Sequence, residues 1–125
     1  MTLQTLIDIK CRNNNEYCKI VFNNFIIDLY KNSNKYKDFL KIEPDWKTLD
    51  QKSISLIVSS MYHLARKTEW KMKVYPWMLD EKFILKEPYF ALNAKGMLKV
   101  ILLQESPKDF RRNNIYVSAN VLEKV

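Results

Sequence analysis

The sequence predicts an all-α fold: a single compact multi-helix domain, with room for a minor β bridge near its C-terminus. Gly96 is the one glycine among 125 residues, whereas an average usage of about 7% would give about nine. Because tight hairpin turns need residues at positive φ, a multi-stranded antiparallel sheet is disfavoured. Three segments show the helical spacing of apolar residues, and a hydrophobic content of 47% argues against intrinsic disorder.

Residues 15–31 are predicted to form a helix with one buried face. Their apolar residues recur at helical spacing, at Cys18, Val21, Phe22, Phe25 and Leu29. The segment that follows, up to Pro44, is polar with a short apolar anchor, and we expect it to act as a hinge.

The clearest predicted helix runs from about residue 48 to residue 67. Thr48 and Gln51 match the T-x-x-Q pattern of a capping box, in which each side chain bonds a free backbone N–H. Beyond them, one apolar stripe recurs every three or four positions, at Ile54, Ile57, Val58, Met61, Leu64 and Ala65. This stripe is expected to face the core.

The next part of the chain is predicted to contain a connector and a further helix. Pro76 breaks the preceding helical pattern, and Pro88 is expected to open a short helical turn. Helical spacing then resumes at Leu98, Ile101, Leu102 and Glu105. Asn93 is the expected N-cap of this helix.

The tail begins with a helix-start signal. Ser106 is predicted to be an N-cap and Pro107 the first helical residue, with Asp109 placed where the helix dipole favours an acid. That helix must be short, because residues 113–114 are both asparagine, which favours a turn. The minor β bridge is expected at residues 115–117.

We expect one domain, because 125 residues suit a single hydrophobic core. Within it, residues 1–43 are interpreted as an N-terminal helical arm or subdomain, and residues 44–125 as the helical core. The formal net charge of +7 is spread along the chain. Nucleic-acid-binding proteins usually concentrate basic residues on one face or arm, and the sequence shows no such concentration.

The sequence MTLQTLIDIKCRNNN at the start lacks the basic and apolar regions of a signal peptide. No apolar run approaches the ~18 residues of a membrane span, so we expect a cytoplasmic protein that does not bind membranes. Cys11 and Cys18 fit reduced, partly buried thiols in that compartment. The alternative is a disulfide or redox pair, although C-x-x-C spacing is missing.

The motifs of most enzyme classes are absent. One glycine excludes a P-loop and the G-x-G-x-x-G fingerprint, and neither H-E-x-x-H nor G-x-S-x-G occurs. We therefore predict no enzyme, no metal site and no cofactor. His63 is the one conventional general base, and Ser59 would share its helix face, but the pair lacks a third orienting group and an oxyanion hole. We interpret His63 as a half-exposed helix histidine.

Aromatic residues and lysines alternate between residues 70 and 90. The aromatic residues are Trp70, Tyr75, Trp77, Tyr89 and Phe90, and the lysines are Lys71, Lys73, Lys82 and Lys86. One interpretation is a stacking platform for single-stranded nucleic acid. The favoured interpretation is that the aromatic residues fill gaps between helices while the lysines remain in solvent. A protein-binding surface is the third.

From residue 44 onward, several short motifs follow one another: PDW, LIVSSMYHLARKTEW, PWM, LKEPYF and MLKVILLQESPKDFRRNNIYVSANVLEKV. With them the chain resembles the small helical domain that follows a lambda-repressor-like helix-turn-helix in many bacterial regulators and antitoxin-like proteins. Those proteins are often encoded beside a nucleotidyltransferase-type toxin. The residues that match the family's tail are Pro107, Phe110, Arg111, Arg112, Ile115, Tyr116, Val117 and Leu122.

The first forty residues show no helix-turn-helix, so the resemblance implies the partner-facing half of such a protein without its DNA reader. It implies a non-catalytic protein-interaction module, antitoxin-like or regulatory, in a two-gene bacterial system. The implied partner is a protein of the nucleotidyltransferase-type toxin class. The alternative is a basic nucleic-acid-binding module, with Lys71, Lys73, Lys82 and Lys86 as the contacts.

The tail also contains two adjacent arginines, Arg111 and Arg112. Neighbouring residues on a helix point about 100° apart, so one side chain can bond an internal group while the other faces out. A guanidinium group can either bond the tail to the rest of the domain or contact an acidic partner or a phosphate. The predicted partner-binding residues are Arg111, Arg112, Tyr116, Trp77 and Tyr89.

Overall fold

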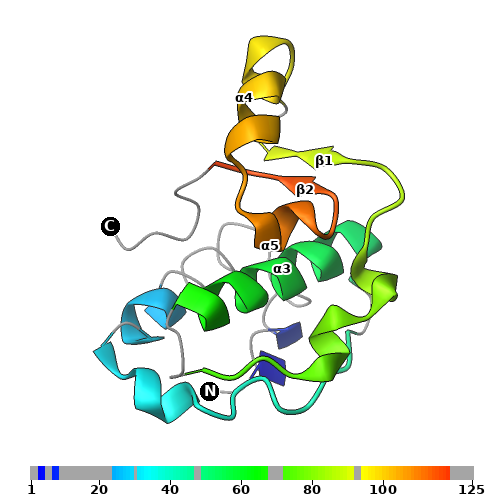
Figure 1. Cartoon of the computed structure of the whole chain (residues 1–125). Helices are drawn as coiled ribbons and strands as arrows, with labels where there is room; N and C mark the ends of the chain where they lie inside the picture. Colours follow the sequence, from blue (N-terminus) through cyan, green and yellow to red (C-terminus); the bar gives the residue numbers. More distant parts are fainter. Residues whose placement is uncertain are drawn as a thin grey trace.

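A computed structural model describes residues 3–4, 7–8, 24–29, 31–46, 49–67, 72–91 and 94–118. In this part of the chain helix predominates, and the β structure is a two-stranded sheet, which confirms the predicted fold class. Figure 1 shows α3 (Gln51–Lys67) crossing the middle of the body, while α4 (Met97–Glu105) projects away from it.

The other elements precede and follow α3 in the chain. Before α3 lie the helical residues 24–29 and the 3-10 helix η1 (Ser33–Tyr36). After it come η3 (Pro76–Leu79), η4 (Glu81–Phe83), β1 (Tyr89–Phe90), α4, α5 (Lys108–Arg111) and β2 (Ile115–Tyr116). Of these later elements, α5 and η4 make the most contacts with α3.

The larger hydrophobic cluster, here called the main core, joins α3 to the segments before and after it. Its buried members are Leu3, Phe25, Ile26, Leu29, Tyr36, Leu40, Val58, Met61, Leu64, Ala65, Met72, Met78 and Phe83. The predicted apolar stripe of α3 is therefore confirmed as a core-facing stripe. Residues on both sides of Pro44 contribute to this cluster, so the N-terminal segment shares its core with α3.

Two predictions for the N-terminal half concern residues only partly described. Within the helix predicted over residues 15–31, residues 24–29 are helical, and both Phe25 and Leu29 are buried. Cys18, Val21 and Phe22 lie outside the described residues, as does Cys11.

The start of α3 differs from its prediction. The helix begins at Gln51, and Asp50 caps it: the Asp50 carboxylate accepts a hydrogen bond from Ser53 N–H at 2.7 Å. Thr48, the predicted cap, lies outside the described residues. An aspartate that precedes a helix can fill the capping position by itself, because its carboxylate reaches the N–H of the third helical residue.

A second, smaller cluster, here called the C-terminal core, lies beneath the two short strands. It consists of Leu85, Phe110, Ile115 and Val117. β1 and β2 pair in parallel, with Tyr89 opposite Ile115 and Phe90 opposite Tyr116. The predicted β bridge is thus present, but the helical turn predicted after Pro88 is wrong. Residues 89–90 extend instead because β2 offers hydrogen-bond partners there.

The junction between α4 and α5 also corrects the prediction. Ser106 is the C-cap of α4 rather than the N-cap of α5, and Pro107 precedes the first helical residue, Lys108. The Ser106 hydroxyl accepts from Val117 N–H at 2.8 Å, and its own proton lies within reach of the Leu102 and Val117 carbonyls. Because the Ser106 hydroxyl is bonded to the backbone of Val117, it does not cap the N-terminus of α5.

Two other features of the tail agree with their predictions. Phe110 is fully buried. Residues 112–114 form a turn, in which Asn114 has a positive φ of 66°, a conformation that asparagine tolerates better than most residues. α4 is present as well, with Gly96 as its N-cap at φ 57°. Asn93, the predicted cap, lies outside the described residues.

Candidate functional site

The side of α3 away from the apolar stripe carries a polar stripe that faces the C-terminal part of the chain. Its residues recur at positions four, four and three apart: Ser55, Ser59, His63 and Arg66. The Ser55 hydroxyl donates to the Phe83 carbonyl. Ser59 accepts a hydrogen bond from the Asn113 side-chain amide at 2.8 Å. α3 therefore bonds to the tail along one face while it packs on the main core with the other.

Asp109 is the centre of this contact. Its carboxylate lies 2.9 Å from His63 Nδ1 and 2.5 Å from Arg66 Nη1, and its side chain is only 6% exposed. The His63 side chain is 15% exposed, so it lies deeper than the half-exposed histidine that the sequence led us to expect. The expectation that His63 lacks an orienting group is wrong, because Asp109 supplies one from 46 residues away.

Ser59, His63 and Asp109 thus all lie where α3 meets the tail, and these are the residue types of a catalytic triad. Ser59 is completely buried and already bonded to Asn113, so a substrate has no access to its hydroxyl. The arrangement fits a fastening between α3 and α5 better than a nucleophile with its base. Spacing along α3 is the signal that would have found the polar stripe in the sequence.

The two adjacent arginines differ in their contacts. Arg112 donates to the Leu79 carbonyl at 2.7 Å and approaches the Asn113 side chain at 3.4 Å, so it ties the tail to the end of η3. Arg111 is exposed and forms no side-chain hydrogen bond or ion pair with any described residue. Arg112 is therefore bonded to the domain, whereas Arg111 faces solvent.

The two strands bring predicted aromatic residues together. Phe90 on β1 and Tyr116 on β2 stack with their ring centroids 4.9 Å apart. Lys99 of α4 places its ammonium 4.7 Å from the Phe90 ring centroid, and Lys52 lies 5.0 Å from that of Tyr89. Tyr89 and Phe90 are both half-buried. This patch combines stacked rings with cations at its edge.

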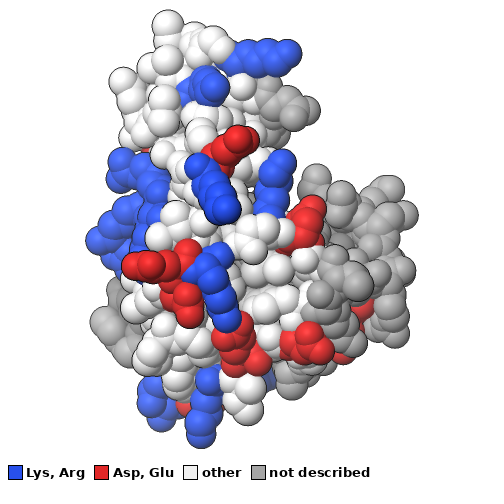
Figure 2. All heavy atoms as spheres, turned by 90° about the vertical axis from the view of Figure 1, so that its right-hand side faces the viewer, with Lys and Arg blue, Asp and Glu red and all other residues white. Residues whose placement is uncertain are grey.

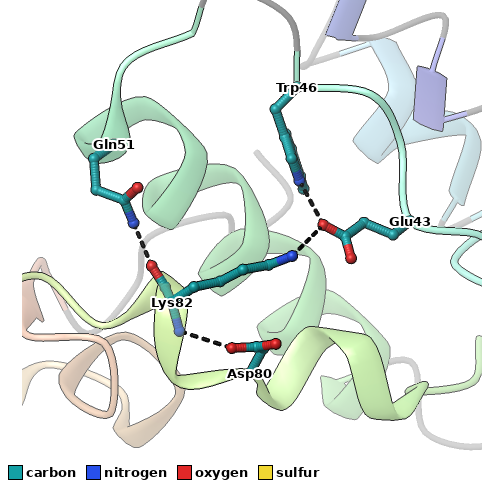
Figure 3. Close-up of polar contacts among 5 residues, drawn as sticks. All are labelled: Glu43, Trp46, Gln51, Asp80 and Lys82. Carbon is teal, nitrogen blue, oxygen red and sulfur yellow. Dashed lines mark hydrogen bonds and ion pairs between the residues drawn. The ribbon is translucent and has the colours of Figure 1, made fainter.

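Trp77 and Lys82, also candidates, have structural contacts instead. Trp77 donates its indole N–H to the Leu40 carbonyl at 2.7 Å and packs on the main core. Figure 3 shows Lys82 between three partners. Its ammonium lies 2.7 Å from Glu43, its N–H bonds Asp80, and its carbonyl accepts from Gln51. Glu43 in turn accepts from the Trp46 indole at 3.0 Å.

The remaining predicted lysines that the structure describes make none of the hydrogen bonds or ion pairs that hold the Lys82 side chain. Lys73 and Lys86 are exposed, while Lys71 lies outside the described residues together with Trp70. The favoured interpretation of the connector, in which its aromatic residues fill gaps, agrees with the packing of Tyr75 and Trp77 on the main core. The candidate lysines that are described do not share one surface element.

Half of the large hydrophobic side chains that the described residues expose lie on helix α4. Five of its side chains are large, apolar and between 40% and 72% exposed: Met97, Leu98, Val100, Ile101 and Leu103. Leu102 is its one buried residue. Exposed single hydrophobic residues are common, whereas contiguous apolar patches are characteristic of surfaces that bind a partner. The sequence predicted the helix, yet its exposure was missed, because helical spacing does not reveal whether a second element covers the helix.

On the N-terminal side of the molecule an open groove of about 720 Å³ is lined by Leu3, Gln4, Asn34, Lys35, Lys37, Asp38, Phe39, Lys41, Ile42, Glu43 and Pro44. Nearby, the hydrogen bond from Tyr36, with those from Lys35 and Asn32, holds the pKa of Asp28 well below its usual range. Burial, followed by the bond to Asp28, raises the pKa of Tyr36 to about 12. The hydrogen bond to Asp38 raises the pKa of Tyr75.

Among the described residues, no group of three or more histidine, cysteine or acidic side chains is placed to hold a metal ion. In the same residues, no helix combines the length and the apolar character needed to cross a bilayer. Comparison with known proteins adds no relative: no family model, no curated protein and no solved structure matches the chain.

Proposed function

We propose that this protein is a non-catalytic protein-interaction module that binds its partner through α4. The supporting observation is the exposure of five large apolar side chains on a helix that buries only Leu102. When a partner covers exposed apolar surface, binding gains free energy of about 25 cal/mol for each Å² removed from water. A helix that contributes so little to the core has its main energetic effect on association.

The resemblance of residues 44–125 to antitoxin-like and regulatory domains supports a role in a bacterial two-gene system. In that role the partner is the product of the neighbouring gene, a nucleotidyltransferase-type toxin. Arg111 supports the same proposal, because an exposed guanidinium group three residues after the start of α5 suits a carboxylate on another protein.

The proposal is tested by co-expressing the protein with the product of the neighbouring gene and measuring co-purification. Ile101→Asp should abolish the complex, because it places a charge on the apolar surface of α4. Ile42 offers a matched control, since it is an isoleucine that is 79% exposed on the N-terminal side of the molecule. Ile42→Asp should leave the complex intact. A complex that survives Ile101→Asp, or none with the wild type, rejects the proposal.

A nucleic-acid-binding module is the second candidate. The stacked Phe90 and Tyr116 rings, with Lys99 beside them, support it, because bases stack on aromatic side chains next to cations. The test is titration with a fluorescent single-stranded oligonucleotide at physiological salt. Binding that is lost in Tyr116→Ala, and weakened by salt, would favour this candidate over the first.

A further inference from the structure

We infer that α4 inserts, as a helix, into an apolar groove of a protein partner, and that the rim of this groove is acidic. The inference rests on the proposed function and adds the shape and charge of the partner's surface. Three features of the described residues support it: the distribution of apolar side chains around α4, the cations beside the helix, and the poor fit of a second copy of this chain.

The apolar side chains surround most of α4. Successive residues of an α-helix are rotated by about 100°, so Met97, Leu98, Val100, Ile101 and Leu103 span roughly 220° of the circumference. Leu102, the buried residue, lies outside that arc. Gln104 and Glu105 fall within it, but they belong to the last turn, next to the body of the domain.

This arc decides the shape of the partner. A helix that packs on a flat surface or on one other helix needs an apolar stripe of roughly 100°. Apolar side chains over twice that angle stay partly in water unless the partner has walls on both sides. A groove that receives an amphipathic or apolar helix is a common mode of recognition, and it covers the whole arc of α4.

The charges beside α4 decide the chemistry of the rim. Lys95 precedes the helix and Lys99 lies in its first turn, and both are exposed. Beyond the helix, α5 adds the exposed Lys108 and Arg111. Figure 2 shows the projecting part of the molecule as mainly uncharged surface with basic side chains at its upper end. Acidic groups around the groove would pair with these cations.

A second copy of this chain does not meet these requirements. The groove described on the N-terminal side is lined by three lysines, Lys35, Lys37 and Lys41, against two acidic residues, Asp38 and Glu43, so its lining is not the acidic rim that the cations beside α4 call for. A symmetric pair of α4 helices would cover only one side of each helix. One helix packs against another through a stripe of roughly 100°, so the rest of the apolar arc of α4 would stay in water.

The first experiment identifies the occupant by site-specific photo-crosslinking in the source cells. The full chain carries a photoreactive phenylalanine analogue at position 101, or at position 42 as the control. A protein adduct that forms at position 101 and not at position 42 is expected. A crosslink to a second copy, to nucleic acid or within the chain to residues 119–125, or no adduct at position 101, would overturn the inference.

The second experiment is a binding titration. Its probe is the partner protein that the crosslink identifies, purified without the crosslink. Ile101→Asp should weaken its binding at least about tenfold, and the double variant Lys95→Glu with Lys99→Glu should do the same, because like charges would then face each other. The matched double variant Lys41→Glu with Lys73→Glu should bind as the wild type does. Added salt should weaken the wild-type complex.

The outcomes separate the inference from the function on which it rests. If Ile101→Asp abolishes binding while the lysine reversals and salt change nothing, the acidic rim is refuted and the interaction function stands. If the purified protein binds but Ile101→Asp has no effect, docking through α4 is refuted. A probe that fails to bind the wild type at all refutes the interaction function together with the inference.

Discussion

Helices α3 and α4 are both rich in apolar residues, yet their surroundings are opposite. α3 packs on the main core along one face and bonds to the tail along the other, through Ser59 and His63. α4 buries only Leu102 and exposes its other large apolar side chains. The difference teaches that apolar content predicts a helix but not its burial: α3 stabilises the fold, whereas α4 presents surface.

The largest difference in stability is expected when an apolar residue of each helix is replaced by aspartate. Leu64→Asp places an unpaired charge at a position of α3 that is fully buried, at a cost of several kcal/mol, which a stability of ~5–15 kcal/mol hardly tolerates. Ile101→Asp should change the free energy of unfolding by less than about 0.5 kcal/mol. Thermal unfolding followed by circular dichroism measures both. Equal destabilisation would show that α4 is part of the folding core.

The next effect concerns the contact between α3 and α5. Asp109→Ala leaves His63 and Arg66 without their shared carboxylate, and the free energy of unfolding should fall by about 3 kcal/mol. Arg66→Ala should cost less, since the Arg66 side chain is 39% exposed and the pair is screened by water. Chemical denaturation compares the two variants. Wild-type stability in Asp109→Ala would mean that the tail is fastened elsewhere.

A smaller contrast is expected between the two arginines. Arg112→Ala removes the hydrogen bond to the Leu79 carbonyl, which contributes about 1 kcal/mol. Arg111→Ala should leave the unfolding free energy within about 0.5 kcal/mol but weaken co-purification with the partner. Melting temperature and co-purification, recorded for each variant, separate the two roles. Loss of binding only in Arg112→Ala would reverse this assignment.

The smallest effect concerns the ionisation of Tyr36, a residue of the main core, and it appears only in alkaline solution. An unfolded tyrosine releases its proton near pH 10, whereas folding raises the pKa of Tyr36 to about 12. Between these values the unfolded state binds fewer protons, so stability falls as pH rises, and the contribution is complete below pH ~10. Tyr36→Phe lacks this contribution. The stability difference between wild type and Tyr36→Phe should therefore shrink over that range, as denaturation at each pH would show.

Local patterns predicted the elements of the fold well. The spacing of Val58, Met61 and Leu64 predicted the buried face of α3, and the adjacent asparagines at positions 113–114 predicted the turn. Both depend on residues that are close in the sequence, where side-chain spacing and backbone preference act directly. The fold class followed from such patterns together with the scarcity of glycine.

Contacts between distant residues were not predicted. Asp109 meets His63 across 46 residues, and β1 extends after Pro88 because β2 pairs with it. Neither partner is visible in a local window. The surface of α4 was missed for a related reason: periodicity marks Leu98 and Ile101 as helical, but only the arrangement of the whole chain shows that no described element covers them.

The bonds of Ser106 have a mechanical consequence. Its hydroxyl lies 2.8 Å from both the N–H and the carbonyl oxygen of Val117, directly below the last turn of α4. α4 therefore resembles a lever with its pivot at this serine. A sideways force on the tip of the helix produces a torque at the pivot, and Val117 receives it first. Such a force would load the two hydrogen bonds that join Ser106 to Val117, the residue that directly follows β2.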